Sequence, residues 1–311
     1  MERKCVYFLC NDPSKDPVAP HVLDAVKTMI NVAPGKLEFE GKTVMEYTDK
    51  NRNRFCFVET DEVFSHNFTT YLPECVRLFG DFDFAGFVNW HAGANAPDDI
   101  LTIHSIGDVP SGYFAPTNPV FYRNILNALN CAIREFALDG WRCCTEATHW
   151  SGTVYGNDPS RIPEFNVPSY DIEIGSSIAS WSNPNAAKAL ASALLHVFDT
   201  SESPKVLLAV GGVHFEQSFS NVALLDTPSV ACAHILPNQW IVSGKYIAEE
   251  GYEKMLRAAE SVLGGIDAVV FHDNLAGAYK SVCRAIADHY GVPAFKHKTL
   301  RDAAKISELL G

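Results

Sequence analysis

Short apolar runs alternate along this chain with longer segments of helical periodicity, and this alternation limits the possible folds more than any other feature. The short runs predict buried strands at residues 6–9, 54–58, 84–90, 101–104, 142–147, 169–174, 205–211 and 268–271. Apolar residues at three- and four-residue spacing predict helices at residues 119–137, 183–198, 252–262 and 275–290. The alternation favours an α/β fold with a mixed, largely parallel sheet and helices on both faces.

The chain length and composition fit one large domain. The 311 residues are 47% hydrophobic and 20% charged, and no repeat, low-complexity segment or long linker divides them. We therefore expect a single α/β domain over residues 1–311. A charged, glycine-containing segment at residues 33–50 is the place where we expect a hairpin or a small lobe.

Membrane and secreted classes fit the sequence poorly. The longest apolar runs, such as Val206 to Val210, are far shorter than the roughly 18 to 20 residues that span a bilayer. The N-terminal apolar run ends at Asn11, which is too early for a signal peptide, so a first buried strand is expected there. The sequence has nine cysteines, an odd number, and no two of them form a C-x-x-C motif. We therefore expect no membrane association and a cytoplasmic protein with free thiols.

The net charge of −12 argues against a general nucleic-acid binder, because phosphate contacts need Lys and Arg. The charge is unevenly distributed, however. Residues 277–311 hold six Lys and Arg against three Asp and Glu, a net +3, which leaves −15 for the rest of the chain. This segment fits either an ordinary solvated helix or a local basic surface. No obligate protein partner is evident, because no coiled-coil seam stands out.

Histidines at strand ends are the main candidates for chemistry. The H-E-x-x-H, G-x-S-x-G, P-loop and G-x-G-x-x-G motifs are all absent from the sequence. His91, His104, His149 and His214 instead follow or end the predicted strands. The carboxyl ends of parallel strands open into one crevice, so these side chains can converge there. Neutral imidazole is a common zinc ligand, although a hydrogen-bonded structural role is the alternative for each histidine.

Two carboxylates and a glycine pair accompany these histidines. Glu146 lies three residues before His149, so both reach one pocket only if the chain turns at residues 147–148. Glu173 alternates with apolar neighbours in a buried strand, where a carboxylate is paired, hydrogen-bonded or metal-bound. Gly211 and Gly212 precede His214 and would let backbone N–H groups approach an oxyanion.

Taken together, several blocks of the sequence resemble the archaeal and plant type of D-aminoacyl-tRNA deacylase. Their order and spacing match the family, and the resemblance covers most of the chain. The blocks are Glu146-Ala-Thr-His149, Pro168-Ser-Tyr-Asp-Ile-Glu-Ile-Gly-Ser176, Trp181, Gly211-Gly-Val-His-Phe215 and Ala233-His-Ile-Leu-Pro237.

The resemblance implies a zinc-dependent hydrolase that cleaves the ester between a D-amino acid and the terminal ribose of tRNA. It also implies an α/β fold related to phosphorylases and peptidyl-tRNA hydrolases, with D-aminoacyl-tRNA as the partner and Zn²⁺ as the cofactor. A metal would both activate water and stabilise the oxyanion of an ester. The implied residues are His149, His214 and Glu146 for catalysis, Gly211, Gly212, Phe215 and Trp150 for substrate binding, and His91, His104, His149 and Glu173 for the metal.

The sequence also departs from the family pattern around these blocks. Trp150-Ser-Gly-Thr153 follows His149 where the family has His-Gly-Pro-Thr, and Glu216 stands in a stretch where the family has Ala-Pro-Arg. A small-residue segment, Ala92-Gly-Ala-Asn95, replaces a polar loop. Two alternatives therefore stay open: a metal-dependent hydrolase of a small ester or amide, and a binding protein that keeps the crevice without turnover.

Overall fold

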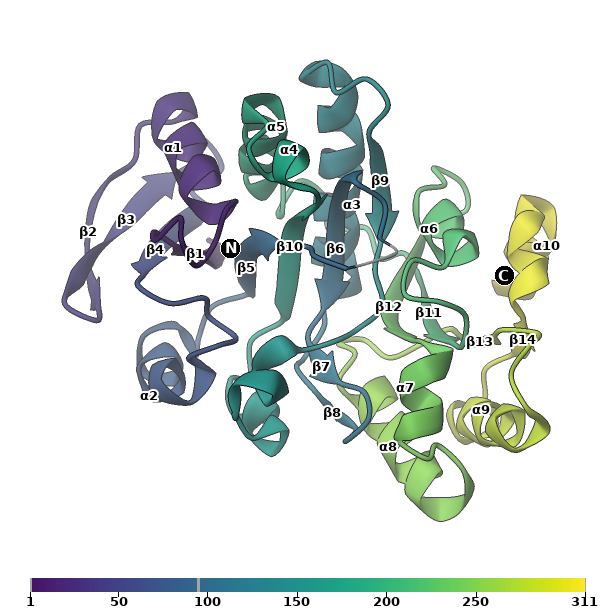
Figure 1. Cartoon of the computed structure of the whole chain (residues 1–311). Helices are drawn as coiled ribbons and strands as arrows, with labels where there is room; N and C mark the ends of the chain where they lie inside the picture. Colours follow the sequence, from purple (N-terminus) through teal and green to yellow (C-terminus); the bar gives the residue numbers. More distant parts are fainter. Residues whose placement is uncertain (1, 94–95, 311) are drawn as a thin grey trace.

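The computed structural model describes residues 2–93 and 96–310, and its strands form two main sheets that lie side by side (Figure 1). The larger sheet has the strand order β2-β3-β4-β1-β5-β10-β6-β9. Its strands are β1 (Lys4–Cys10), β2 (Ala33–Phe39), β3 (Lys42–Thr48), β4 (Arg54–Thr60), β5 (Phe84–Trp90), β6 (Asp99–Ser105), β9 (Arg142–Thr145) and β10 (Ser169–Ser176).

This larger sheet is mixed. Strands β4, β1, β5 and β10 run parallel to one another, β6 runs antiparallel to β10, and β9 runs parallel to β6. The antiparallel hairpin β2–β3 occupies most of residues 33–50 and extends the sheet at the edge next to β4. A two-stranded ribbon, β7 (Gly107–Asp108) and β8 (Tyr113–Phe114), follows β6.

The smaller sheet is parallel throughout, with the order β12-β11-β13-β14. It comprises β11 (Lys205–Val210), β12 (Val230–Leu236), β13 (Ala268–Phe271) and β14 (Ala294–Lys296). Residues 146–149 form the seam between the sheets, because the Ala147 N–H donates to the His214 carbonyl and the Thr148 N–H to the Ile235 carbonyl. The single sheet expected from the sequence is therefore divided in two, since hydrogen bonding of the first sheet ends at β9.

Helices cover both faces of each sheet. Helices α1 (Ala19–Met29), α3 (Pro119–Glu135) and α5 (Pro184–Leu194) share one core with one face of the larger sheet, and α2 (Phe68–Phe79) covers the other face. On the smaller sheet, α8 (Ala248–Glu260) and α9 (Gly277–Tyr290) lie against one face, and α6 (Gln217–Ala223) and α10 (Ala303–Leu310) against the other. This arrangement confirms the α/β class, whereas the finer relation to phosphorylases stays a prediction.

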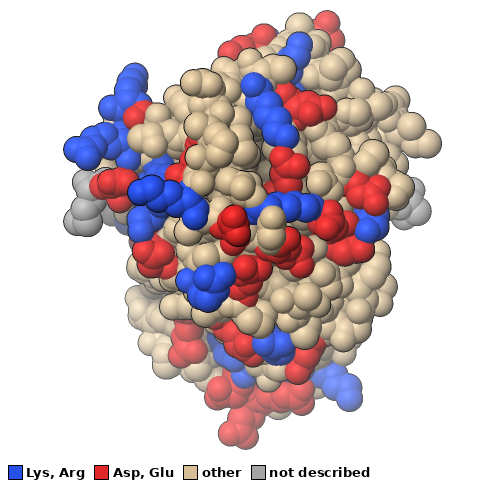
Figure 2. Space-filling view, turned by 90° about the vertical axis from the view of Figure 1, so that its left-hand side faces the viewer, with Lys and Arg blue, Asp and Glu red and all other residues tan. Residues whose placement is uncertain are grey.

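Shorter elements complete the chain. They are the helices α4 (Ile178–Trp181) and α7 (Asn238–Ser243) and the 3₁₀ turns η1 (Ser151–Tyr155), η2 (Pro159–Glu164) and η3 (His297–Arg301). Figure 2 shows the side of the molecule that carries the hairpin, where Lys and Arg are interspersed with Asp and Glu. Among the described helices, none combines the length and the apolar character that crossing a bilayer requires.

Candidate active site

A cleft of about 360 Å³ brings His91, His149 and His214 together, and its walls include strands of the larger sheet and the loop that follows β11 of the smaller one. His91 directly follows β5, and Glu173 lies on the adjacent strand β10. His149 follows β9, and His214 comes from the smaller sheet, four residues beyond β11. His104, near the end of β6, is fully buried behind the cleft, where its ring stacks on that of His149 with centroids 3.8 Å apart.

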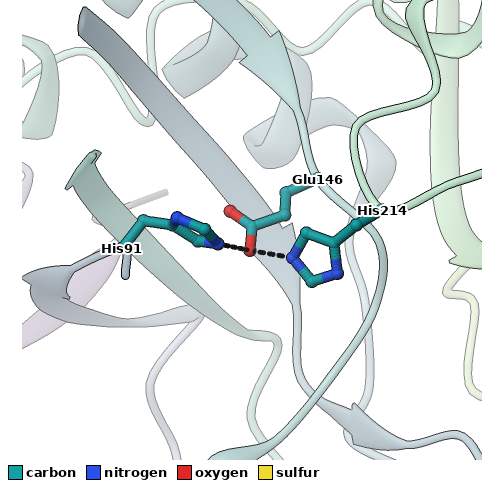
Figure 3. Close-up of side chains that lie close together, drawn as sticks. All are labelled: His91, Glu146 and His214. Atoms are coloured by element: carbon teal, nitrogen blue, oxygen red, sulfur yellow. Dashed lines mark hydrogen bonds and ion pairs between the residues drawn. The ribbon is translucent and has the colours of Figure 1, made fainter. Parts of the chain in front are cut away.

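Glu146 is the centre of a first group of side chains. Its Oε1 lies 2.6 Å from Nε2 of His214 and 3.3 Å from Nε2 of His91 (Figure 3). The same oxygen is 3.7 Å from Nδ1 of His149, so the chain does turn after β9 as the sequence requires for a shared pocket. The Glu146 carboxyl group is buried, and its Oε2 has no hydrogen-bond partner among the described residues.

A second group consists of His104, His149 and Glu173. Nε2 of His104 is 3.6 Å from Oε1 of Glu173 and 3.4 Å from Oδ2 of Asp171. Within residues 2–93 and 96–310, neither this ring nitrogen nor Oε2 of Glu173 has a hydrogen-bond partner. Buried polar atoms without partners are costly, so this group is arranged for something other than internal hydrogen bonding.

Backbone carbonyls determine the tautomer of two of these histidines. Nδ1 of His104 lies 3.1 Å from the Ser105 carbonyl, and Nδ1 of His149 lies 2.9 Å from the Ala147 carbonyl. A carbonyl only accepts, so each neutral ring carries its proton on Nδ1 and presents a lone pair at Nε2. For His104 this lone pair faces the Glu173 carboxyl group, and a cation or a proton between them removes the repulsion.

Burial favours the neutral form of three of these histidines. It holds the pKa of His104 well below its usual value, lowers the pKa of His149 to about 4, and lowers the pKa of His91. A neutral imidazole is the form that binds metals.

The pKa values of the carboxyl groups are shifted in different directions. Burial, and next the Glu146 charge, raise the pKa of Glu173 well above its usual value, and burial raises the pKa of Asp171 to about 8. Burial also opposes ionisation of Glu146, but the short hydrogen bond from His214 favours it, and the pKa of Glu146 lies below the usual range. Glu146 is therefore the ionised carboxylate of the site.

The two groups account for the metal ligands expected from the sequence. His91, Glu146 and His214 form one set, and His104, His149 and Glu173 form another, with ligand atoms of each set within 4.8 Å of one another. His91 is thus separated from the other three expected ligands and paired with Glu146. The two Nε2 lone pairs and the unpartnered Glu173 oxygen described above fit a divalent cation in the set of His104, His149 and Glu173.

The residues expected to bind substrate have different outcomes. Gly211 and Gly212 have φ values of +91° and +80°, and the turn they form brings His214 to the cleft. The Gly211 N–H donates to the Leu236 carbonyl at 2.7 Å, so it is not free for an oxyanion. Phe215 does lie at the site, with its ring centroid 4.9 Å from that of His91. Trp150 was expected at the site but is a core residue that packs edge-on against Phe68.

Some site residues were missed by the sequence reasoning. Asp171 shares the strand face of Glu173 and accepts a hydrogen bond from Asn89 Nδ2 at 2.8 Å. The alternation that singled out Glu173 applies equally to Asp171 and could have found it. His234 is structural, since its ring nitrogens lie 2.9 Å from Ser105 Oγ and 2.8 Å from Ser261 Oγ. In the segment after His91, residues 94 and 95 lie outside the described residues.

Known proteins resemble this chain in sequence and in fold. Residues 78–295 match the family model described as D-aminoacyl-tRNA deacylase. The D-aminoacyl-tRNA deacylase of Pyrococcus furiosus is 30% identical over 200 residues, which cover 63% of this chain and 67% of that protein. The Pyrococcus abyssi protein of the same name is 29% identical over 202 residues, with the same shares covered.

A solved structure extends the fold comparison to nearly the whole chain. A crystal structure described as a conserved protein of unknown function aligns with a TM-score of 0.74 and 19% identity, covering 97% of this chain and 98% of that one. The match in structure concerns the fold alone. Because the family model covers most of the sequence and includes the strands that carry the histidine cleft, the chain belongs to the D-aminoacyl-tRNA deacylase family.

Proposed function

We propose that the protein hydrolyses the ester of D-aminoacyl-tRNA in the cleft around Glu146, with zinc as its cofactor. The family is one of ester hydrolases, and the convergence of three histidines on one carboxylate oxygen carries the proposal. Ester hydrolysis needs a base to take a proton from water and a group to stabilise the developing oxyanion. The cleft offers candidates for both.

His214 is the proton acceptor that the geometry favours. Its side chain is 26% exposed, whereas the Glu146 side chain behind it is fully buried. The 2.6 Å contact between them fixes the imidazole and stabilises its protonated form. The other ring nitrogen of His214 is left to take a proton from a water molecule in the cleft.

His104, His149 and Glu173 are the ligands that we assign to zinc. Two Nε2 lone pairs and a buried carboxyl group are a donor set that Zn²⁺ prefers, with room for water or substrate in a further position. Zinc bound there would supply a Lewis acid that polarises the ester carbonyl and lowers the pKa of water. His91 belongs to the Glu146 group, where its Nδ1 lies 2.8 Å from Ser176 Oγ and its ring is held in place.

The test compares hydrolysis of D-tyrosyl-tRNA and L-tyrosyl-tRNA by the purified protein. We expect selective loss of the D-ester, inhibition by a chelator, recovery with Zn²⁺, and no activity in His149→Ala. Hydrolysis that a chelator does not affect would contradict the metal assignment alone. No hydrolysis of either ester by folded, zinc-loaded protein would contradict the proposed function and favour a binding relative without turnover.

A smaller ester or amide substrate is the second candidate, and one observation favours it. No Lys or Arg is among the described residues that line the cleft, and the chain carries a net charge of −12. A small neutral ester needs no phosphate contacts. Equal kcat/KM values for D-tyrosyl-tRNA and D-tyrosine ethyl ester would favour this candidate over the first.

We also propose that the protein works in the cytoplasm. All nine cysteines are free, and Cys131 is exposed without a disulfide partner. Free thiols in such number are typical of a reducing compartment, which is also where aminoacyl-tRNA is used.

A further inference from the structure

An aromatic rim borders the histidine cleft, and the hydrolytic mechanism does not use it. We define this rim as His66, Trp90, Tyr155 and Trp240, all of which line the cleft. The rings of His66 and Tyr155 stack with centroids 3.5 Å apart and planes 21° from parallel. Trp240 lies beside the histidines, 5.4 Å from the ring of His214.

The outer part of the rim is open to solvent. Tyr155 is 54% exposed and its neighbour Val154 is 85% exposed, whereas Glu146, which lies behind His214, is 1% exposed. Exposure at this level shows that the Tyr155 ring is not there to fill the core. An exposed aromatic ring that is already fixed by a parallel stack offers a free face to another flat ring.

The chemistry of the rim selects among the parts of an aminoacyl-tRNA. No Lys or Arg is found among the described residues lining the cleft, so the walls do not suit a phosphate. Aromatic rings instead bind unpaired bases by stacking on their faces. The paired hydroxyls of Ser65 and Ser151, 2.7 Å apart in the same cleft, add groups that could hydrogen-bond a base edge.

The orientation of the substrate in the cleft decides which of its parts lies beside the aromatic rim. The ester must reach the buried histidine and carboxylate groups, while the body of the tRNA stays outside the cleft. The terminal nucleoside therefore lies on the outward side of the ester, and the amino acid lies on the inward side. A smaller hollow of about 200 Å³, lined by His91, His214 and Phe215 among others, is available to the amino-acid side chain.

We propose that Tyr155, stacked on His66, binds the terminal adenine base of the substrate; this inference rests on the proposed function. Tyr155 then acts on substrate binding and not on the chemical step. It also gives the protein a means to prefer an ester of tRNA over a free amino-acid ester without a positively charged cleft.

The experiment compares two D-tyrosine esters, one with 3′-adenosine and one with ethanol, using wild type, Tyr155→Ala and Tyr155→Phe. We expect Tyr155→Ala to raise KM for the adenosine ester about tenfold more than KM for the ethyl ester. Tyr155→Phe should behave as wild type, because it keeps the ring. Tyr252→Ala, which removes a tyrosine on α8 outside the cleft, is the matched control.

A binding measurement separates this inference from the proposed function. The probe is adenosine with D-tyrosine joined at the 3′ position through an amide, which resists ester hydrolysis. Tenfold weaker binding of this probe to Tyr155→Ala supports the stacking role even if wild type hydrolyses neither ester. Equal effects of Tyr155→Ala on both esters, or no effect on ester KM and probe binding, would overturn the inference.

Discussion

At the residue scale, Glu146 is the buried carboxylate around which the histidines of the site are placed. One of its oxygens lies within 3.3 Å of both His91 and His214, and the side chain is fully buried. We expect Glu146→Gln to lower kcat by at least about 100-fold, because the neutral amide cannot stabilise a protonated imidazole. Steady-state deacylation kinetics measure this effect, with thermal unfolding to verify the fold. Glu62→Gln removes an exposed carboxylate that pairs with Lys15 and serves as the control.

The same substitution also tests the assignment of the base. If Glu146→Gln retained most of the wild-type kcat, the contact between Glu146 and His214 would be structural, and another group would have to accept the proton. A large rise in KM with an unchanged kcat would place Glu146 in substrate binding instead.

Asp16 is a buried carboxyl group whose titration should be visible in the stability of the protein. Its Oδ1 accepts the N–H groups of Val18 and Ala19 at 2.8 Å, and its Oδ2 has no partner among the described residues. Burial raises its pKa to about 7. The folded protein therefore binds this proton more tightly than the unfolded chain does, and the free energy of unfolding falls as the pH rises from about 4 to about 7.

We expect Asp16→Asn to reduce this loss of stability by about 2 kcal/mol, because the amide keeps an acceptor for the two N–H groups but does not ionise. Urea unfolding at a series of pH values from 4 to 8 measures the difference. Asp12→Asn, in the same turn but not buried, should keep the wild-type slope. If the free energy of unfolding of Asp16→Asn changed with pH as that of the wild type does, the Asp16 proton would not be linked to folding.

The four candidate histidines could be predicted from the sequence because each follows or ends an apolar run. What the sequence could not give is the direction of each ring. The carbonyls of Ser105 and Ala147 orient His104 and His149, and such contacts depend on local backbone geometry. Trp150 shows the same limit, since its position next to His149 suggested a site residue while its ring turns into the core.

At the scale of elements, the strands and helices with a clear period were predictable, and those with a mixed composition were not. Strand β12 was missed because Cys, Ala and His interrupt its apolar pattern. Helix α2 contains Pro73, a residue that argues against a helix interior. The division into two sheets was also not predictable, because it depends on which strands pair, and pairing partners lie far apart in the sequence.

One buried side chain also links elements that pack on the two different sheets. Arg123 on α3 donates hydrogen bonds to the carbonyls of Ala223, Leu225 and Val230, which belong to α6, the following turn and β12. We expect Arg123→Met to lower the free energy of unfolding by about 2–4 kcal/mol, because several buried carbonyls lose their donor. Chemical denaturation measures this loss. Arg123→Lys should recover part of it, and an unchanged stability in Arg123→Met would mean that water replaces the guanidinium.

At the scale of the whole molecule, the charge distribution has to be reconciled with a polyanionic substrate. The face in Figure 2 mixes both signs and offers no basic surface. The net +3 of residues 277–311 lies elsewhere, and it includes the exposed residues Lys296, Lys298 and Arg301. This segment is connected to the cleft, because His297 stacks on His272, and His272 lies 3.7 Å from Glu216, two residues after His214.

This connection predicts where the phosphates of the tRNA are bound. We expect log KM for D-tyrosyl-tRNA to rise linearly with log salt, and each of Lys296→Gln, Lys298→Gln and Arg301→Gln to reduce the slope by about 1. Lys188→Gln, on the exposed side of α5, should leave the slope unchanged. Each salt series is measured with D-tyrosine ethyl ester in parallel, which carries no phosphate and should show no slope. Unchanged slopes in all three variants would place the acceptor stem on another face, and a flat wild-type profile would favour a small substrate.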